Sequence, residues 1–364
     1  MDFSFTPEQE MLRDSLGKLL AQTYAFDQRQ ALLKADAPRS EPIWQALAEM
    51  GLLALPFAEG EGGLGGQPSD LVACGMVMGR HIFAEPWLGA IILGGKALAL
   101  GGDRAQTLLT DVLAGSAHVA LAHEERHGIG AVAQMATTLT LDDGTLRLSG
   151  EKKLVLGGAD ATAMIVSGRA GDKLTLVRVD PAAPGVTVTG YRMIDGRRAA
   201  TVRFDAVVLA PDAVLRDDAE AALNAVIDDA LLTLSAEAVG AMSALLEMTG
   251  AYAATRKQFG VPIGSFQAMA HRLADMKIAW AKAQALLLYT TALIEAGKAT
   301  PRDVALLKAQ MGRLGRSVGE SAVQVHGGIG MTDELAVGHY LKRLLCIEAM
   351  LGSTDYHLRR VGAR

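Results

Sequence analysis

Cysteine is scarce in this sequence, and its scarcity limits the class of protein. Only Cys74 and Cys346 occur among 364 residues. Two thiols so far apart argue against a disulfide scaffold or a cysteine-rich metal site, and they fit a reducing cytoplasm. The eight histidines are scattered, and no His or Cys pair has ligand spacing with a second pair to match. No metal site is therefore expected.

An excess of charge of either sign is also missing. Lys and Arg number 35 against 40 Asp and Glu, a net charge of −5, and no run of five like charges occurs. Nucleic acid is therefore an unexpected partner. The first residues lack a basic start followed by an apolar run, and Lys96 and several glycines interrupt the most apolar stretch, residues 87–101. We expect neither a signal peptide nor a membrane span.

Three common catalytic or nucleotide-binding signatures are absent as well. The chain has no GxSxG elbow, no GxxxxGK[ST] loop and no GxGxxG motif that follows a strand pattern. These absences exclude the usual serine-hydrolase, P-loop and Rossmann routes to function.

Hydrophobic periodicity divides the chain into three parts. Half of the residues are hydrophobic, enough for a large core. Apolar residues recur at helical spacing in residues 6–115, alternate in residues 117–210, and return to helical spacing from residue 217 onward. We expect a mainly α fold with a central β domain, divided as an N-terminal helical domain (1–116), a middle β domain (117–212) and a C-terminal helical bundle (213–364).

Two segments of the C-terminal part are unusual for surface helices. In residues 254–267 a helix ends at Arg256-Lys257, an aromatic precedes Gly260, and Gln267 opens the next helix. In residues 324–332 three glycines in four positions interrupt an apolar helix. Arginine offers a planar fork for phosphate, glutamine an amide for phosphate or adenine, and glycine a backbone that a ligand can approach. Together these segments can hold a dinucleotide.

Taken singly, each residue has a simpler structural explanation. Arg256 and Lys257 can be solvated cations at a helix end, Gly327-Gly328 an ordinary helix stop, and His326 a satisfied surface imidazole. For His326 we keep the structural explanation.

Taken jointly, the two segments resemble the acyl-CoA dehydrogenase family. RKQFG with its downstream Gln, and QxHGGxG, match the family in order, spacing and helical setting, and the resemblance covers the whole chain. The loop from Pro56 to Gly66 and the Gly150-Glu151-Lys152 segment are also similar to family motifs. The resemblance implies a helical domain, a β-barrel-like domain and a four-helix C-terminal bundle.

The resemblance also implies a chemistry. Family members bind FAD between a β domain and helices of two subunits, oxidise an acyl-CoA thioester to the 2-enoyl-CoA, and pass electrons to an acceptor. A glutamate removes the α-proton. The implied FAD contacts, which reach the neighbouring subunit's cofactor, are Arg256, Gln258, Phe259, Gln267, Gln324, Gly327 and Gly328.

The catalytic base is where this chain departs from the family. Leu351 stands where most members carry the glutamate, and Ala230 stands at the alternative position on an earlier helix. Neither side chain takes a proton. Glu348 and Asp229 are nearby carboxylates, each more typical of a surface or helix-pairing charge.

The β domain departs too. Leu154-Val155-Leu156 replaces the family's Trp-[IV]-[ST] strand, so the ring platform and the hydroxyl are missing. The nearest counterpart of the TExxxGSD loop is residues 123–128, HEERHG. The groups that serve a neighbour's FAD are kept, whereas those that would hold the chain's own flavin and substrate are lost.

Three hypotheses follow. The chain is a dehydrogenase subunit that completes the FAD site of a Glu-bearing partner, like the small subunit of pimeloyl-CoA dehydrogenase or the paired dehydrogenases of steroid breakdown. Alternatively, it is a non-catalytic structural or binding subunit. The third hypothesis is a homomeric enzyme with a displaced carboxylate. In every case we expect an oligomer, and fatty acid, steroid or dicarboxylate catabolism as the setting.

Overall fold

The computed structural model describes residues 4–35, 37, 39–125 and 134–362. The chain forms two compact units, which are described separately. The helical unit comprises the described parts of Met1–Ala31, Gln67–Ala84 and Leu231–Arg364, and the sheet unit comprises those of Leu32–Gly66 and Glu85–Ala230.

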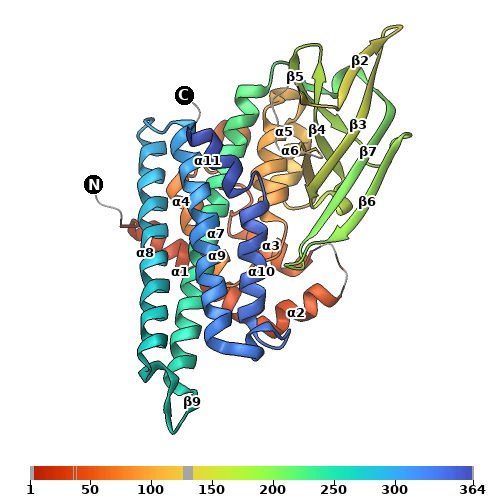
Figure 1. The fold of residues 1–364 in the computed structure, drawn as a ribbon. Helices are drawn as coiled ribbons and strands as arrows, with labels where there is room; N and C mark the ends of the chain where they lie inside the picture. The colour runs from red at the N-terminus through yellow and green to blue at the C-terminus, as the bar shows by residue number, and fades with distance from the viewer. Residues whose placement is uncertain (1–3, 36, 38, 126–133, 363–364) are drawn as a thin grey trace. The chain divides into compact units, whose positions relative to one another are not determined.

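In sequence, helices make up most of the chain before and after the strands of the sheet (Figure 1). Their boundaries follow the capping signals of the sequence. Thr6 and Gln9 form a capping box before the first helix, and Thr300 and Asp303 form another before the ninth. The helices are α1 Pro7–Thr23, α2 Phe26–Lys34, α3 Glu41–Glu49, α4 Pro68–Arg80, α5 Lys96–Ala99, α6 Gln106–Leu113, α7 Glu220–Thr255, α8 Gln267–Glu295, α9 Pro301–His326, α10 Ala336–Ala349 and α11 Thr354–Gly362.

In the helical unit, α4 and α7 pack backbone against backbone. A Cβ atom on Gly79 would lie 2.0 Å from the carbonyl oxygen of Glu237, and one on Gly240 would lie 1.9 Å from that of Met76. Only glycine permits such an approach. In the described part of the chain, α7 is the one helix whose length and composition would suit a membrane span, but 78% of its most apolar window is buried inside the protein. It is a core helix.

The sheet unit is built on an eight-stranded sheet in the order β6-β7-β3-β2-β4-β5-β8, with β1 beside β4. The hairpin of β2 and β3 turns at Asp143-Gly144, whose φ angles of 46° and 72° suit a type I′ turn. The strands are β1 Val119–Ala122, β2 Thr138–Asp142, β3 Thr145–Leu156, β4 Ala163–Ala170, β5 Lys173–Val179, β6 Val186–Arg192, β7 Arg198–Leu209 and β8 Val214–Arg216.

A π-helix, η2 Trp87–Gly95, packs against this sheet. A Cβ atom on Gly94 would lie 2.5 Å from the carbonyl oxygen of Val119, and one on Gly89 would lie 3.0 Å from that of Leu156. The glycines that interrupt this apolar stretch therefore let its backbone lie directly on β1 and β3.

The expected succession of a helical region, a β region and a second helical region is confirmed. The boundaries at residues 116 and 212 stay a prediction, because the two compact units divide the chain at other positions.

Candidate functional site

The segment after α7 is a short hairpin that extends beyond the ends of α7 and α8 (Figure 1). Strands β9 Lys257–Gln258 and β10 Val261–Pro262 pair antiparallel across the turn Phe259-Gly260. Phe259 has a φ of 52° and is 94% exposed. An aromatic side chain that is exposed to water and held in a left-handed conformation does not stabilise this fold. The position therefore suggests a binding role.

The fold brings the two glycine-containing motifs together. Ile263, which follows the hairpin, packs with Ala253 of α7 and Val325 of α9 in one buried cluster. The Tyr252 ring stacks on the His326 ring with 4.4 Å between centroids. The ends of α7 and α9, far apart in sequence, therefore present Arg256 and Gln324 on the same helical unit.

The polar members of these motifs are available to a ligand. Gln258, Gln267 and Gln324 are all exposed, and Gln267 is the first residue of α8. Arg256 is exposed, and no carboxylate among the described residues pairs with it. A free guanidinium and three free amides are donors that suit a diphosphate.

Gly327 and Gly328 show why a ligand fits here. Gly327 has a φ of 70°, which favours glycine. A Cβ atom on Gly328 would meet no atom within 4 Å, and this residue has no positive φ. Nothing in the chain itself requires glycine at position 328. Open space beside the backbone is what a cofactor held against it would need, so the motif residues fit FAD.

His326 is satisfied, as expected, but it is not a surface residue. Its side chain is 6% exposed, and its Nδ1 lies 2.8 Å from the carbonyl oxygen of Ala322. Stacking on Tyr252 removes the ring from water. The sequence pattern did not reveal this burial, because it depends on contact between two distant helices.

Leu351 lies in the turn between α10 and α11. Its side chain is 5% exposed and its φ is 54°. Its carbonyl oxygen accepts a hydrogen bond of 2.8 Å from Nε2 of the buried His357. Burial lowers the pKa of His357 to about 4, so the ring is neutral. The backbone of this turn is held firmly, but its side chain has no proton-accepting group.

The two carboxylates proposed as displaced bases both have structural partners. Glu348 Oε1 accepts a 3.0 Å hydrogen bond from the backbone N–H of Thr354, the first residue of α11. Asp229 forms an ion pair with Lys96 inside the sheet unit. A helix-capping carboxylate and an ion-paired one would each need to break these contacts to take a proton.

In the sheet unit, Leu154 sits at an irregularity in the pairing of β3 with β7. The register shifts between Lys152 and Val155, and Leu154 has a φ of 49°. Val155 is fully buried, whereas Leu154 and Leu156 are half-buried. The strand therefore has a bulge at Leu154, and Leu154-Val155-Leu156 carries neither an aromatic ring nor a hydroxyl.

Next to this bulge lies a buried polar cluster. The ammonium of Lys152 donates to Glu125 Oε1 at 2.9 Å, to the carbonyl oxygen of His123 at 3.1 Å and to Ser167 Oγ at 3.2 Å. Burial lowers the pKa of Lys152 to about 8, and burial together with the Lys152 charge lowers that of His123 to about 3. Although burial alone would raise it, Lys152 and backbone N–H groups lower the pKa of Glu125 to about 2.

Part of this cluster comes from residues 123–128, the nearest counterpart of the TExxxGSD loop. The Glu125 side chain in this segment is 15% exposed and paired with Lys152. Arg126, His127 and Gly128 of the same expected loop lie outside the described residues.

A second buried ion pair was missed by sequence reasoning. Arg343 of α10 donates to Glu237 of α7 at 2.7 and 2.5 Å, and Arg343 is 1% exposed. Arg343 also lies 3.6 Å from Met350 Sδ, next to Leu351. Opposite charges 106 positions apart carry no pairing signal in one sequence, so only the fold reveals this contact.

Comparison with known proteins defines the class. The model of the acyl-CoA dehydrogenase N-terminal domain matches residues 6–108, and that of the C-terminal domain matches residues 221–364. The chain belongs to the acyl-CoA dehydrogenase family, a family of flavoprotein oxidoreductases that use FAD and act on CH–CH bonds.

Individual relatives span nearly the whole chain. The acyl-CoA dehydrogenase IpdE2 of Mycobacterium tuberculosis is 30% identical over 356 residues, covering 97% of this chain and 96% of the relative. The ChsE4-ChsE5 complex from Mycobacterium tuberculosis matches with a TM-score of 0.91 at 25% identity, covering 100% of this chain and 98% of that one. The Tcur3481-Tcur3483 steroid acyl-CoA dehydrogenase matches with a TM-score of 0.86 at 29% identity, covering 98% and 96%.

Proposed function

We propose that this chain is a subunit of a heteromeric acyl-CoA dehydrogenase, in which it completes the FAD site of a partner that carries the catalytic glutamate. The reaction is the α,β-oxidation of an acyl-CoA thioester. The likeness to two structures of paired dehydrogenases, one of them described as acting on steroids, supports this assembly and favours a bulky acyl group.

The observation that carries the proposal is an asymmetry between two sets of residues. Arg256, Phe259 and Gln324 are exposed and free for an outside ligand. Leu351 and Ala230 fill both positions of the family's base with buried apolar side chains. If the chain had simply lost its activity, random substitutions would be expected to remove residues of both sets equally.

Each motif residue has a distinct role toward the cofactor. Arg256 binds the diphosphate with its planar fork, and Gln258 and Gln324 add amide donors. Phe259 packs against the cofactor, Gln267 serves the adenine side, and the open backbone at Gly327 and Gly328 lets the diphosphate approach. When bound, FAD would accept a hydride from the acyl chain.

A homomeric enzyme with a displaced base gains no support from the contacts of its candidate residues. Glu348 caps α11, and Asp229 pairs with Lys96. Flavin binding distinguishes a non-catalytic subunit from the proposed one. A purely structural chain would not need an unpaired Arg256, and its replacement should not change the flavin content.

Arg256→Ala tests the proposal. A charge-assisted hydrogen bond to phosphate contributes roughly 1.5–3 kcal/mol, so we expect flavin affinity to fall ten-fold or more. The measurement is the flavin retained per chain after gel filtration, for this chain purified together with its partner. Arg302→Ala, which removes an exposed arginine from the opposite end of α9, is the control and should retain flavin. Unchanged flavin in Arg256→Ala would refute the assignment.

A further inference from the structure

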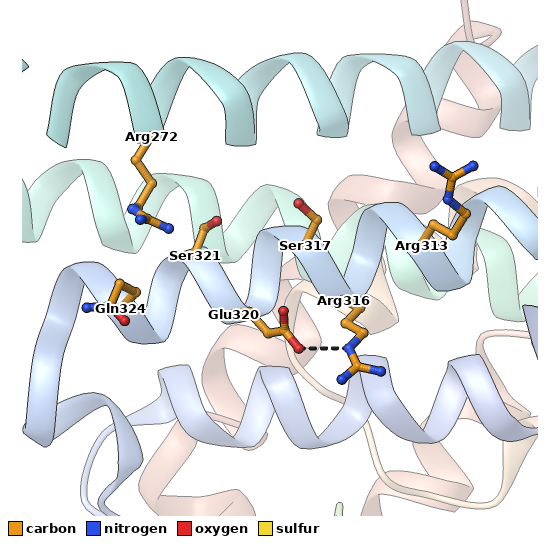
Figure 2. A pocket seen from close by; sticks show the side chains of 7 residues that line it. All are labelled: Arg272, Arg313, Arg316, Ser317, Glu320, Ser321 and Gln324. Carbon is orange, nitrogen blue, oxygen red and sulfur yellow. Dashed lines mark hydrogen bonds and ion pairs between the residues drawn. The ribbon is translucent and has the colours of Figure 1, made fainter. Parts of the chain in front are cut away.

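A cavity of about 400 Å³ lies between α8 and α9 of the helical unit (Figure 2). Apart from Gln324 at one end, its lining residues belong to neither sequence motif. We call it the arginine groove, and it is lined by Arg272, Arg313, Arg316, Ser317, Glu320, Ser321 and Gln324.

The groove carries an uncompensated positive charge. Its lining includes three arginines and one glutamate, a formal charge of 3 − 1 = +2. Glu320 is already used by Arg316, whose Nε lies 2.7 Å from the carboxylate. No ion pair joins Arg272 or Arg313 to a carboxylate within the residues that the structure describes. Two guanidiniums therefore face the groove without a counter-charge.

Arg272 gives a second, independent indication of a ligand. Its Nε is buried and has no hydrogen-bond acceptor among the described residues. A buried guanidinium donor without an acceptor is costly, and native proteins rarely leave one unsatisfied. An anion bound in the groove would supply the missing acceptor after a small rotation of the Arg272 side chain.

Two hydroxyls complete the lining. Ser317 and Ser321 are one helical turn apart on α9, and in Figure 2 their hydroxyls point into the space between Arg272 and Arg313. Four residues of helix rise about 6 Å, so the two serines offer donors to two separate oxygen-rich groups. In the view the Arg272 guanidinium lies beside Ser321, whereas Arg313, one helical turn before Ser317 on α9, points toward α8 rather than toward that serine.

We propose that the arginine groove binds a small polyanion with two phosphate groups, one held by Arg272 and Ser321 and the other by Arg313 and Ser317. Phosphate suits the site because arginine forks and hydroxyls both donate to its oxygens. Arg313 lies roughly 16 Å along α9 from Gln324, by the helical rise of eleven residues. The groove therefore meets the motif that we assign to FAD at Gln324, and its Arg313 end lies beyond that motif. The anion site proposed here does not depend on the FAD assignment.

The test is calorimetric titration of the purified chain at low salt with inorganic pyrophosphate and with adenosine 3′,5′-bisphosphate. We expect one site per chain, weakened by added salt. Arg313→Gln and Arg272→Gln should each lower the affinity ten-fold or more, whereas Arg302→Gln, outside the groove on the same helix, should leave it unchanged. Tighter binding of the adenosine ligand would indicate a nucleotide source, and equal binding a free phosphate compound.

Three results would overturn the proposal. The first is no binding of either probe at millimolar concentration to folded chain. The second is binding that the two groove variants leave intact. The third is binding that FAD displaces one for one and that Arg256→Ala abolishes, which would assign the anion to the cofactor motif. These results are distinguishable from failure of the proposed function, which would appear as unchanged flavin retention in Arg256→Ala. Arg313→Gln should weaken anion binding and still retain flavin.

Discussion

Leu351 lies in a turn whose backbone is firmly held and whose side chain is apolar. The carbonyl oxygen of this residue binds His357, and the residue stays in a left-handed conformation with a φ of 54°. The turn therefore has a fixed backbone, and its side chain offers no group that could accept a proton. Under our proposal, the base of the shared site comes from the partner subunit.

The buried pair of Arg343 and Glu237 gives a stability prediction. Arg343→Met should lower the free energy of unfolding by about 3–5 kcal/mol, because it leaves a buried carboxylate without its partner. The double variant Arg343→Met with Glu237→Leu should recover most of that loss. Urea unfolding of both variants checks this, and equal losses in the single and double variants would contradict it.

Residue roles differ in how far the sequence predicts them. The exposed glutamines and Arg256 were predicted because they belong to short motifs whose spacing is local. The cap formed by Glu348 and the burial of His326 were not, because both depend on contacts between elements far apart in the chain.

At the scale of elements, the hairpin of β9 and β10 is shaped for recognition. Its turn places Phe259 where asparagine or glycine would be less strained, with φ angles of 52° and 84° at positions 259 and 260. The exposed ring contacts the edge of the Phe266 ring, at 6.2 Å between centroids. The hairpin therefore holds an exposed aromatic ring in a strained conformation, as our proposed FAD contact would require.

Phe259→Asn separates the fold from the function of this hairpin. Asparagine tolerates the left-handed conformation, so the free energy of unfolding should stay the same or rise by up to ~1 kcal/mol. Flavin retention by the complex should nevertheless fall, since the ring is lost. Phe259→Tyr, which keeps the ring, is the control. A destabilised Phe259→Asn chain with normal flavin retention would show that the residue serves the fold.

Elements that are encoded by a local sequence pattern could be predicted, whereas elements that depend on distant contacts could not. The hairpin of β2 and β3 follows from alternating residues around Asp143-Gly144, and α9 follows from Thr300-Pro301 and its apolar spacing. The π-helix at Trp87–Gly95 has no such local signal. Its geometry depends on glycines that meet the backbones of β1 and β3, which only the folded unit brings near.

At the scale of the whole molecule, the chain combines the family fold with motif residues that we assign to a neighbour's cofactor. Its matches to family models cover both ends of the chain, and two of the structures that it resembles contain paired dehydrogenase chains. Under our proposal, the residues that serve a neighbour's cofactor persist because the neighbour needs them. Self-sufficient catalysis is then unnecessary for this chain.

The most direct measurement compares reduction of flavin by saturated acyl-CoA in two preparations, this chain alone and this chain co-expressed with a family member that has Glu at the position of Leu351. A positioned base contributes about 10²–10⁴-fold, so the chain alone should reduce flavin at least a hundred-fold more slowly or not at all. The co-purified complex should carry one FAD per unlike pair and reduce it at an ordinary enzymatic rate. Rapid flavin reduction by the chain alone, or failure of the two chains to co-purify, would contradict the proposed subunit role.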